Sequence, residues 1–361
     1  MQNNGSALHS VWTWAFPLAA AVLLIAQHLH VAGGPAAAVL STAVLVGSVF
    51  AAVHHAEVVA ARIGEPFGSV VLAVAVTVIE VSLIISLMLS SPETASEIAR
   101  DTVFAAFMIV LNGVVGLCLL FGGIRYYEQD FHTHASSGAL GVLGTLATLV
   151  LILPNYTLAE PGPVFAPAQL AFVASVSVAL YGLYLFVQTV RHRAYFLDIS
   201  QDEIKTARPP ARQVAISSVL LVIALAAVIL LAEEMSPMIQ AGVTHLGLPS
   251  AFVGVIIAAV VLMPEGLAAF RASRMNRLQT SLNLALGSAL ASIGLTIPTV
   301  AITSLLIGMP LTLGLEDEEM VLLILTLFAS TLTLATGRTT VLQGGVHMVI
   351  FGVFLVIAAI P

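Results

Sequence analysis

Long apolar runs recur along this chain, and they limit the fold classes open to it. Only 9% of the 361 residues are charged, whereas a soluble domain carries roughly 25%, so the chain could not cover a soluble surface. Strands of a membrane barrel would be shorter and would alternate in polarity. The sequence therefore predicts an all-α polytopic membrane protein with about 11 transmembrane helices. The runs lie near 11–31, 35–61, 66–90, 102–123, 137–154, 166–190, 213–232, 249–270, 280–307, 320–337 and 340–360.

The 12 Lys and Arg residues are distributed unevenly between the two ends of these runs. If the N-terminus is cytoplasmic, 11 of them fall on the cytoplasmic side and only Arg100 falls on the other. Cytoplasmic loops of membrane proteins carry an excess of Lys and Arg. We therefore expect a cytoplasmic N-terminus and, because the number of spans is odd, an external C-terminus.

Two glutamates deep inside apolar runs give the strongest functional signal. Glu80 in V-T-V-I-E-V and Glu265 in V-L-M-P-E-G lie at similar depths in runs that cross in opposite directions. A charged group at such a depth costs at least ~2.5 kcal/mol, and no Lys or Arg lies deep in a run to pair with it. Acids matched in this way are typical of transporters with inverted repeats and a site near the membrane midplane. A buried hydrogen bond between helices is the structural alternative.

Other oxygen-bearing side chains lie near these acids or in the runs that follow them. Thr77 precedes Glu80 by three residues and shares its helix face, while Asn112 and Ser288 lie in the runs after the two acids. Pro264 frees a backbone carbonyl one turn before it. Oxygen ligands suit hard cations such as Ca²⁺, Na⁺ and K⁺, and buried carboxylates also bind protons. The pattern indicates an antiporter, with helix–helix packing as the alternative role for the amide and the hydroxyls.

The cytoplasmic end of the second run holds a less specific pattern. His54 and His55 point about 100° apart on a helix, which argues against a two-histidine metal site, whereas His54 and Glu57 share a face. One interpretation is a proton relay or pH sensor, because histidine titrates near neutrality. The other is a hydrogen bond between helices near the membrane surface. Glu65, in G-E-P-F-G, is a further candidate for the same cytoplasmic entrance.

Two stretches resemble a known family. Residues 54–89, H-H-A-E-V-V-A-A-R-I-G-E-P-F-G-S-V-V-L-A-V-A-V-T-V-I-E-V-S-L-I-I-S-L-M-L, look like the first motif region of ChaA-type cation/proton antiporters of the calcium/cation antiporter superfamily. Residues 263–298, which begin M-P-E-G-L-A-A-F, are similar to its second repeat. The resemblance implies export of Ca²⁺, or of Na⁺ and K⁺, in exchange for protons. It places the family's site residues at Glu80, Glu265, Asn112, Gly287 and Ser288.

The resemblance covers nearly the whole chain and implies one leading helix followed by two inverted five-helix repeats. The expected divisions are 1–32 for the leading helix, 33–190 for the first repeat, 191–212 for a cytoplasmic linker and 213–361 for the second repeat. We expect an integral protein of the bacterial inner membrane that contacts the lipid bilayer. Its expected partners are inorganic cations and protons, with no cofactor and no nucleic acid, and its oligomeric state is open.

The motifs depart from the family pattern around both acids. Many calcium/proton exchangers have Gly-Asn-Ala before each acid, where this chain has 77–79 (T-V-I) and 262–264 (L-M-P). Gly266 stands where a histidine commonly follows the second acid. Ca²⁺ is the most expected cation, and a monovalent Na⁺/H⁺ or K⁺/H⁺ antiporter or a cation channel is the alternative. An enzyme is not expected, because the chain has no H-E-x-x-H metal motif and no nucleophile with a base.

Overall fold

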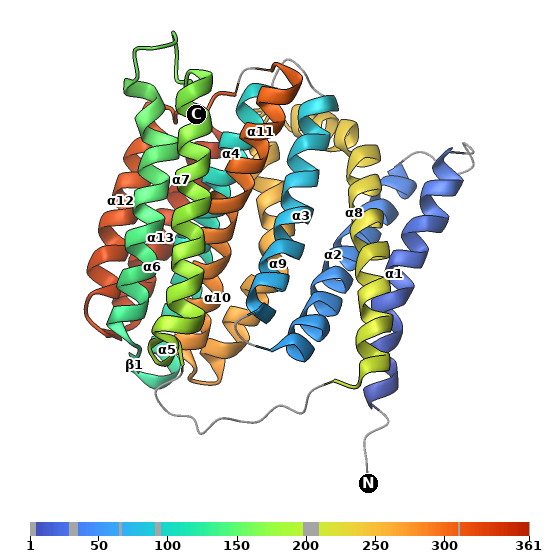
Figure 1. Cartoon of the computed structure of the whole chain (residues 1–361), viewed down its shortest axis with the longest axis horizontal. Helices are drawn as coiled ribbons and strands as arrows, with labels where there is room; N and C mark the ends of the chain where they lie inside the picture. Colours follow the sequence, from blue (N-terminus) through green and yellow to red (C-terminus); the bar gives the residue numbers. More distant parts are fainter. Residues whose placement is uncertain are drawn as a thin grey trace. The chain divides into compact units, whose positions relative to one another are not determined.

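The computed structural model describes residues 5–28, 35–64, 67–90, 95–197, 209–309 and 311–360. Each predicted run corresponds to one helix or one unbroken helical stretch, which confirms the all-α fold (Figure 1). The elements are α1 (Gly5–His28), α2 (Pro35–Ile63), α3 (Phe67–Ser90), α4 (Ala95–Met108), η1 (Ile109–Val114), α5 (Val115–Tyr126), β1 (Gln129–Asp130), α6 (Thr133–Ala147), η2 (Thr148–Ile152), η3 (Leu153–Tyr156), α7 (Pro167–Phe186), η4 (Val187–Arg191), η5 (Arg193–Phe196), α8 (Ala211–His245), α9 (Phe252–Arg274), α10 (Leu278–Ala291), η6 (Ser292–Thr296), α11 (Ile297–Ile307), α12 (Asp317–Leu334), β2 (Arg338–Thr339) and α13 (Val341–Ala359).

Eight helical stretches of the described residues are long and apolar enough to cross a membrane, and two shorter apolar helices lie at 11–27 and 74–86. The protein is therefore an integral membrane protein. One boundary differs clearly from expectation, since α8 continues to His245 instead of ending near 232. Glu233 and Glu234 interrupt the apolar run there, but glutamate is a good helix former, so the helix extends beyond the apolar segment.

The chain forms two compact units. Unit 1 comprises 1–91 and 205–246, and unit 2 comprises 92–204 and 247–361. Both units take segments from both halves of the sequence, so they are not the two consecutive repeats that the resemblance implies, and that division stays a prediction. In unit 1, α2 packs against α1, α3 and α8, and α8 also contacts α1 and α3.

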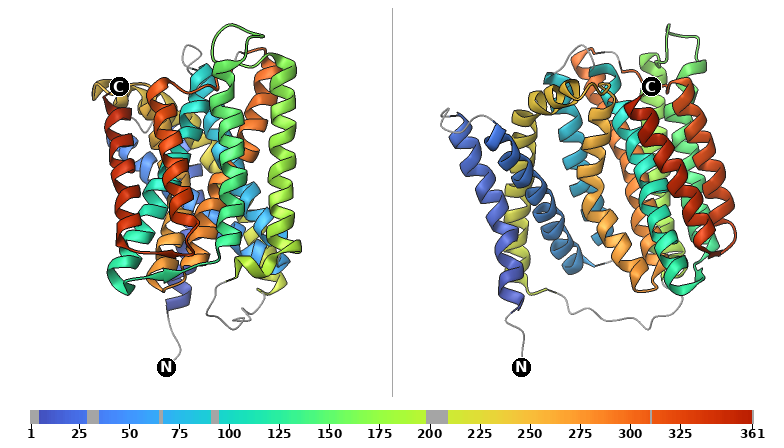
Figure 2. Two further views of the ribbon diagram at one scale, coloured as in Figure 1. Left: turned by 90° about the vertical axis from the view of Figure 1, so that its left-hand side faces the viewer. Right: turned by 180° about the vertical axis from the view of Figure 1, so that it is seen from behind.

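Unit 2 contains two packing arrangements that repeat each other (Figures 1 and 2). Helix α13 packs along α5 and η1, while α7 packs along α11 and η6. The last helix of each half of the sequence therefore lies against a long helical stretch of the other half. Two short backbone pairings follow the same exchange: β1 pairs antiparallel with β2, and Val164 pairs with Thr312. This reciprocity is what two structural repeats of one topology produce.

The helical stretch on which α13 packs contains the π-helical segment η1, and the stretch on which α7 packs contains the π-helical segment η6. Such segments are rare and are frequent at functional sites. Each contains a glycine that faces an aromatic side chain of the exchanged helix. A Cβ on Gly113 would lie 3.2 Å from the ring of Phe351, and one on Gly294 would lie 2.8 Å from Cβ of Tyr181. Pro264, which the sequence analysis associates with a freed backbone carbonyl, lies inside α9, and that helix continues through it.

Arg100, the basic residue predicted on the outer side, is buried near the start of α4 with 4% of its surface exposed. Its Nε donates to Oδ1 of the buried Asp101 at 2.8 Å, and its Nη1 donates to the carbonyl oxygen of Gly314 at 3.3 Å. Its Nη2 lies 3.7 Å from Oε1 of Glu316. Arg100 therefore ties the start of α4 to the segment before α12 and neutralises a buried carboxylate.

Replacing Arg100 with Gln is expected to destabilise unit 2 by about 3–5 kcal/mol, because the Asp101 carboxylate would stay buried without its cation. The double variant Arg100→Gln/Asp101→Asn is expected to recover much of that loss, since two neutral amides avoid the uncompensated charge. The measurement is the Tm of the purified protein in detergent for the wild type, both single variants and the double variant. Strictly additive losses would contradict the coupling.

Candidate cation-binding site

Glu80 and Thr77 lie together on α3 in unit 1. Both are buried, with 3% and 7% of their surfaces exposed. The Thr77 hydroxyl is buried and has no hydrogen-bond partner. Nearly all buried polar groups in proteins are hydrogen-bonded, so a buried hydroxyl without a hydrogen-bond partner needs an explanation. A hydroxyl oxygen one turn from a buried carboxylate is suited to binding a cation or a water molecule.

Glu265 and Ser288 lie on the neighbouring helices α9 and α10 of unit 2. These helices pack against each other, and the Ser281 hydroxyl joins them by donating to the carbonyl oxygen of Ala269 at 2.8 Å. The Ser288 hydroxyl is buried and, like that of Thr77, has no hydrogen-bond partner. A Cβ on the adjacent Gly287 would meet no atom within 4 Å. The Gly-Ser pair that the resemblance singles out therefore combines open space beside Gly287 with an unsatisfied hydroxyl on Ser288.

Asn112 lies in the π-helical segment η1, and none of its surface is exposed. Its Nδ2 donates to Oγ1 of Thr326 in α12 at 2.9 Å, and its Oδ1 lies 3.0 Å from Nδ1 of His347 in α13. The other ring nitrogen of His347, Nε2, lies 3.2 Å from Oγ1 of Thr333 in α12. Asn112 is therefore the first member of a buried polar network that joins three helical segments of unit 2.

No motif in the sequence predicts a site role for His347, Thr326 or Thr333. A partial signal was present in α12, because Thr326, Ser330 and Thr333 are spaced by four and three residues and share a helix face. All three are buried. His347 has no such signal, since it is a single polar residue between apolar neighbours and its partner Asn112 is 235 residues away in the sequence.

The predicted cytoplasmic group lies in unit 1 and is spread over different surroundings. His55 is buried in α2, where its Nε2 lies 3.1 Å from the Thr13 carbonyl oxygen in α1 and its Nδ1 lies 3.3 Å from Oγ of Ser217 in α8. This arrangement joins three helices. The His54 ring is half-buried, 5.5 Å from the His55 ring, and Glu57 is exposed. Glu65 lies outside the described residues. A relay role for this group stays a prediction.

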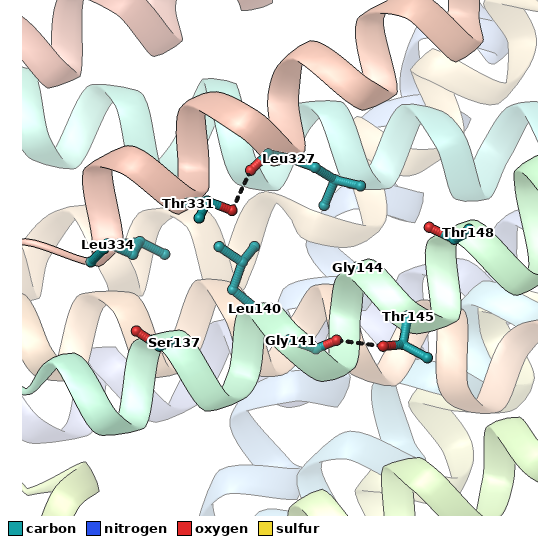
Figure 3. A pocket seen from close by; sticks show the side chains of 10 residues that line it. Ser137, Leu140, Gly141, Gly144, Thr145, Thr148, Leu327, Thr331 and Leu334 are labelled. Atoms are coloured by element: carbon teal, nitrogen blue, oxygen red, sulfur yellow. Dashed lines mark hydrogen bonds between the residues drawn. The ribbon is translucent and has the colours of Figure 1, made fainter.

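A groove of about 360 Å³ lies between α6 and α12 in unit 2 (Figure 3). None of the predicted site residues lines it. The hydroxyls of Thr145 and Thr331 turn back to carbonyl oxygens of their own helices, at 2.8 Å from Gly141 and 2.7 Å from Leu327. Its walls thus present mainly methyl groups and aliphatic side chains, which do not bind cations.

Among the described residues, no three or more His, Cys, Asp or Glu side chains are grouped so that they could hold a metal ion. The motifs predict mixed oxygen ligands for a transported cation. The predicted ligands fall in both compact units, with Glu80 and Thr77 in unit 1 and Glu265, Ser288 and Asn112 in unit 2. That these five residues form one ligand set stays a prediction.

Comparison with known protein families shows to which family the chain belongs. The model of the sodium/calcium exchanger protein family matches the chain over 34–190 and again over 216–360. The chain belongs to this family. The exchanger is 55% identical to a putative ionic transporter y4hA of Sinorhizobium fredii, over 99% of the chain and 98% of that protein. It is 35% identical to the sodium-potassium/proton antiporter ChaA of Escherichia coli, over 86% of the chain and 85% of that protein.

Solved structures show that the exchanger has the fold of this family. The structure of native YfkE matches 97% of the chain and all of that protein, with a TM-score of 0.73 and 16% sequence identity. The H⁺/Ca²⁺ exchanger CAX matches 96% of the chain and 89% of that protein, with a TM-score of 0.69 and 16% identity. These matches confirm the prediction that the chain is a member of a cation antiporter family. This family consists of exchangers and not of enzymes.

Proposed function

We propose that this exchanger moves a cytoplasmic cation outward in exchange for external protons by alternating access, with Glu80 and Glu265 binding both. The observation on which this proposal depends is that motif helices in both halves combine a deep glutamate with a buried, unsatisfied hydroxyl. Thr77 supplies that hydroxyl in α3, and Ser288 supplies it in α10 beside α9. Carboxylate and hydroxyl oxygens suit a hard cation, and carboxylates take up protons when the cation leaves.

Ca²⁺ is the first candidate cation, because two carboxylates neutralise one divalent ion. A monovalent cation is the second, and the relatives favour it. The relative named a sodium-potassium/proton antiporter is 35% identical, whereas the Ca²⁺/H⁺ antiporter of Aphanothece halophytica is 23% identical over 68% of the chain. The few amide side chains around the two acids also weaken the similarity to calcium exchangers.

For the cellular setting, we propose the bacterial inner membrane with the N-terminus in the cytoplasm. The distribution of Lys and Arg supports this orientation. In this orientation protons enter the cell down their gradient while the cation leaves. The membrane supplies low-dielectric surroundings, in which binding of a cation or a proton to a carboxylate is favoured over a bare charge.

The expected result in inverted membrane vesicles is a release of protons that depends on the added cation. Vesicles from cells that overproduce the protein are acidified by respiration and loaded with a fluorescent pH dye, and then Ca²⁺, Na⁺ or K⁺ is added separately. At least one of these cations should discharge the pH gradient, and the concentration that gives half of the response measures the preference. Vesicles from the same host with an empty vector are the control. Cation flux without proton movement would indicate a channel and contradict the proposal.

A further inference from the structure

The polar network around Asn112 contains a continuous series of close contacts. The hydroxyl of Thr326 donates to the Met108 sulfur at 3.4 Å, and its oxygen accepts from Nδ2 of Asn112 at 2.9 Å. The amide oxygen Oδ1 of Asn112 lies 3.0 Å from Nδ1 of His347, and it accepts a hydrogen bond there when the ring is the tautomer that carries its proton on Nδ1. In that tautomer Nε2 accepts from the Thr333 hydroxyl at 3.2 Å.

This tautomer of His347 favours one orientation of the Asn112 side chain. Rotation of the amide by 180° would place the Asn112 amide NH₂ group against the proton on Nδ1 of His347. An amide oxygen has two lone pairs, and the contact with His347 uses one of them. A cation bound to Asn112 would use the other.

Close packing of α13 on α5 holds His347 at this place. A Cβ on Gly116 of α5 would lie 2.8 Å from Cβ of His347, so only glycine allows the histidine to approach so closely. His347 itself is buried, with 1% of its surface exposed. The ring is therefore held by its backbone position as well as by its two hydrogen bonds.

The other packing arrangement in unit 2, in which α7 packs along α11 and η6, lacks this network. Asn112 precedes Gly113, the glycine that faces Phe351, whereas Ile293 precedes Gly294, the glycine that faces Tyr181. Four residues before Phe351 stands His347, and four residues before Tyr181 stands Ser177. The Ser177 hydroxyl donates to the Val173 carbonyl oxygen of its own helix at 2.8 Å. The exchanged packing thus forms without a polar contact at that position, so packing alone does not require His347.

We propose that His347 is a positioning residue for cation exchange, which orients the Asn112 amide so that its oxygen can bind the transported hard cation. The inference rests on the proposed function and on the role of Asn112 in it. In metal sites, partners that hydrogen-bond to a ligand orient it, and their loss typically lowers metal affinity about 10- to 100-fold. His347 should therefore affect the KM for the cation more than the maximal rate.

The test compares two amide substitutions that each replace one ring nitrogen. In His347→Asn the new amide occupies the place of Nδ1 and can still donate to Asn112. In His347→Gln it reaches the place of Nε2, toward Thr333, and loses contact with Asn112. In the vesicle assay we expect the KM of His347→Gln to rise about 10-fold or more with a smaller change in maximal rate. The KM of His347→Asn should stay close to that of the wild type.

Phe354→Leu provides the matched control on α13. Phe354 is buried to a similar degree, with 2% of its surface exposed, lies two turns further along, and packs against the ring of Phe104. It should lower the Tm without changing the KM. If the His347 variants do not accumulate, Thr333→Val tests the same network, because it removes the hydroxyl that is hydrogen-bonded to Nε2 of His347. A raised KM is expected there too.

The outcomes separate this inference from the proposed function. A wild-type KM for His347→Gln or Thr333→Val, or a KM that rises equally in His347→Asn, His347→Gln and Phe354→Leu, would overturn the positioning role while leaving antiport intact. Absence of cation-driven proton release in the wild type would instead overturn the proposed function.

Discussion

Glu80→Gln and Glu265→Gln are each expected to abolish cation-driven proton release in inverted vesicles. Glutamine keeps the size and hydrogen-bonding capacity of glutamate but removes the charge that would pair with a cation and the group that would take up a proton. Removal of one partner of a buried charge pair costs about 3–5 kcal/mol, which corresponds to a loss of about 100-fold or more in affinity. Transport should therefore fall below detection at cation concentrations that saturate the wild type.

The matched control is Glu234→Gln, which makes the same change at an exposed position of α8. It should exchange cations like the wild type. All three variants should elute as the wild type does in size-exclusion chromatography, which shows that the loss is one of transport and not of folding. Normal exchange by both Glu80→Gln and Glu265→Gln would show that the site assignment is wrong.

Gly344→Ala is expected to destabilise the packing of α13 on α5. Helix α13 crosses α5 so closely that a Cβ on Gly344 would overlap the backbone nitrogen of Leu120. Backbone cannot rotate aside as a flexible side chain can, so the two helices would have to separate. Overpacking of this kind costs about 1–3 kcal/mol and occasionally more. We expect the Tm in detergent to fall by about 5 °C or more.

Gly345, the residue next to Gly344, provides a control with the same substitution. A Cβ on Gly345 would meet no atom within 4 Å, and alanine is favoured over glycine in a helix by up to about 1 kcal/mol. Gly345→Ala should therefore leave the Tm unchanged or raise it slightly. Equal losses of stability for the two variants would mean that the close approach of α13 to α5 does not exist.

Much of the helical architecture was predictable because it depends on local composition. Apolar runs long enough to span a bilayer specify a helix almost irrespective of their neighbours, and each predicted run is helical. The end of α8 was predicted too early because hydropathy reports contact with lipid, whereas the helix continues through Glu233 and Glu234 into a more polar segment. The helical hydrogen-bond pattern does not stop where the apolar surface ends.

The candidate site was only partly predictable for a different reason. Glu80 and Glu265 stand out because a charge is rare in an apolar run, and Thr77 follows from its spacing to Glu80. The partners of Asn112 do not stand out, since Thr326 and His347 reach it only through the packing of α12 and α13 on η1. The π-helical segments η1 and η6 also have no distinct signal in the sequence, although in each of them a glycine, Gly113 or Gly294, faces an aromatic side chain of another helix.

The exchange of last helices in unit 2 has a consequence for how the protein is made. Helix α7 is synthesised well before α11, the helix on which it packs. Helix α5 is likewise synthesised well before its partner α13, the last helix of the described residues. The face of α5 that carries Gly116 and Gly123 must therefore remain in contact with lipid or with the insertion machinery until α13 has been made. A chain that stops before 341 would leave this face uncovered.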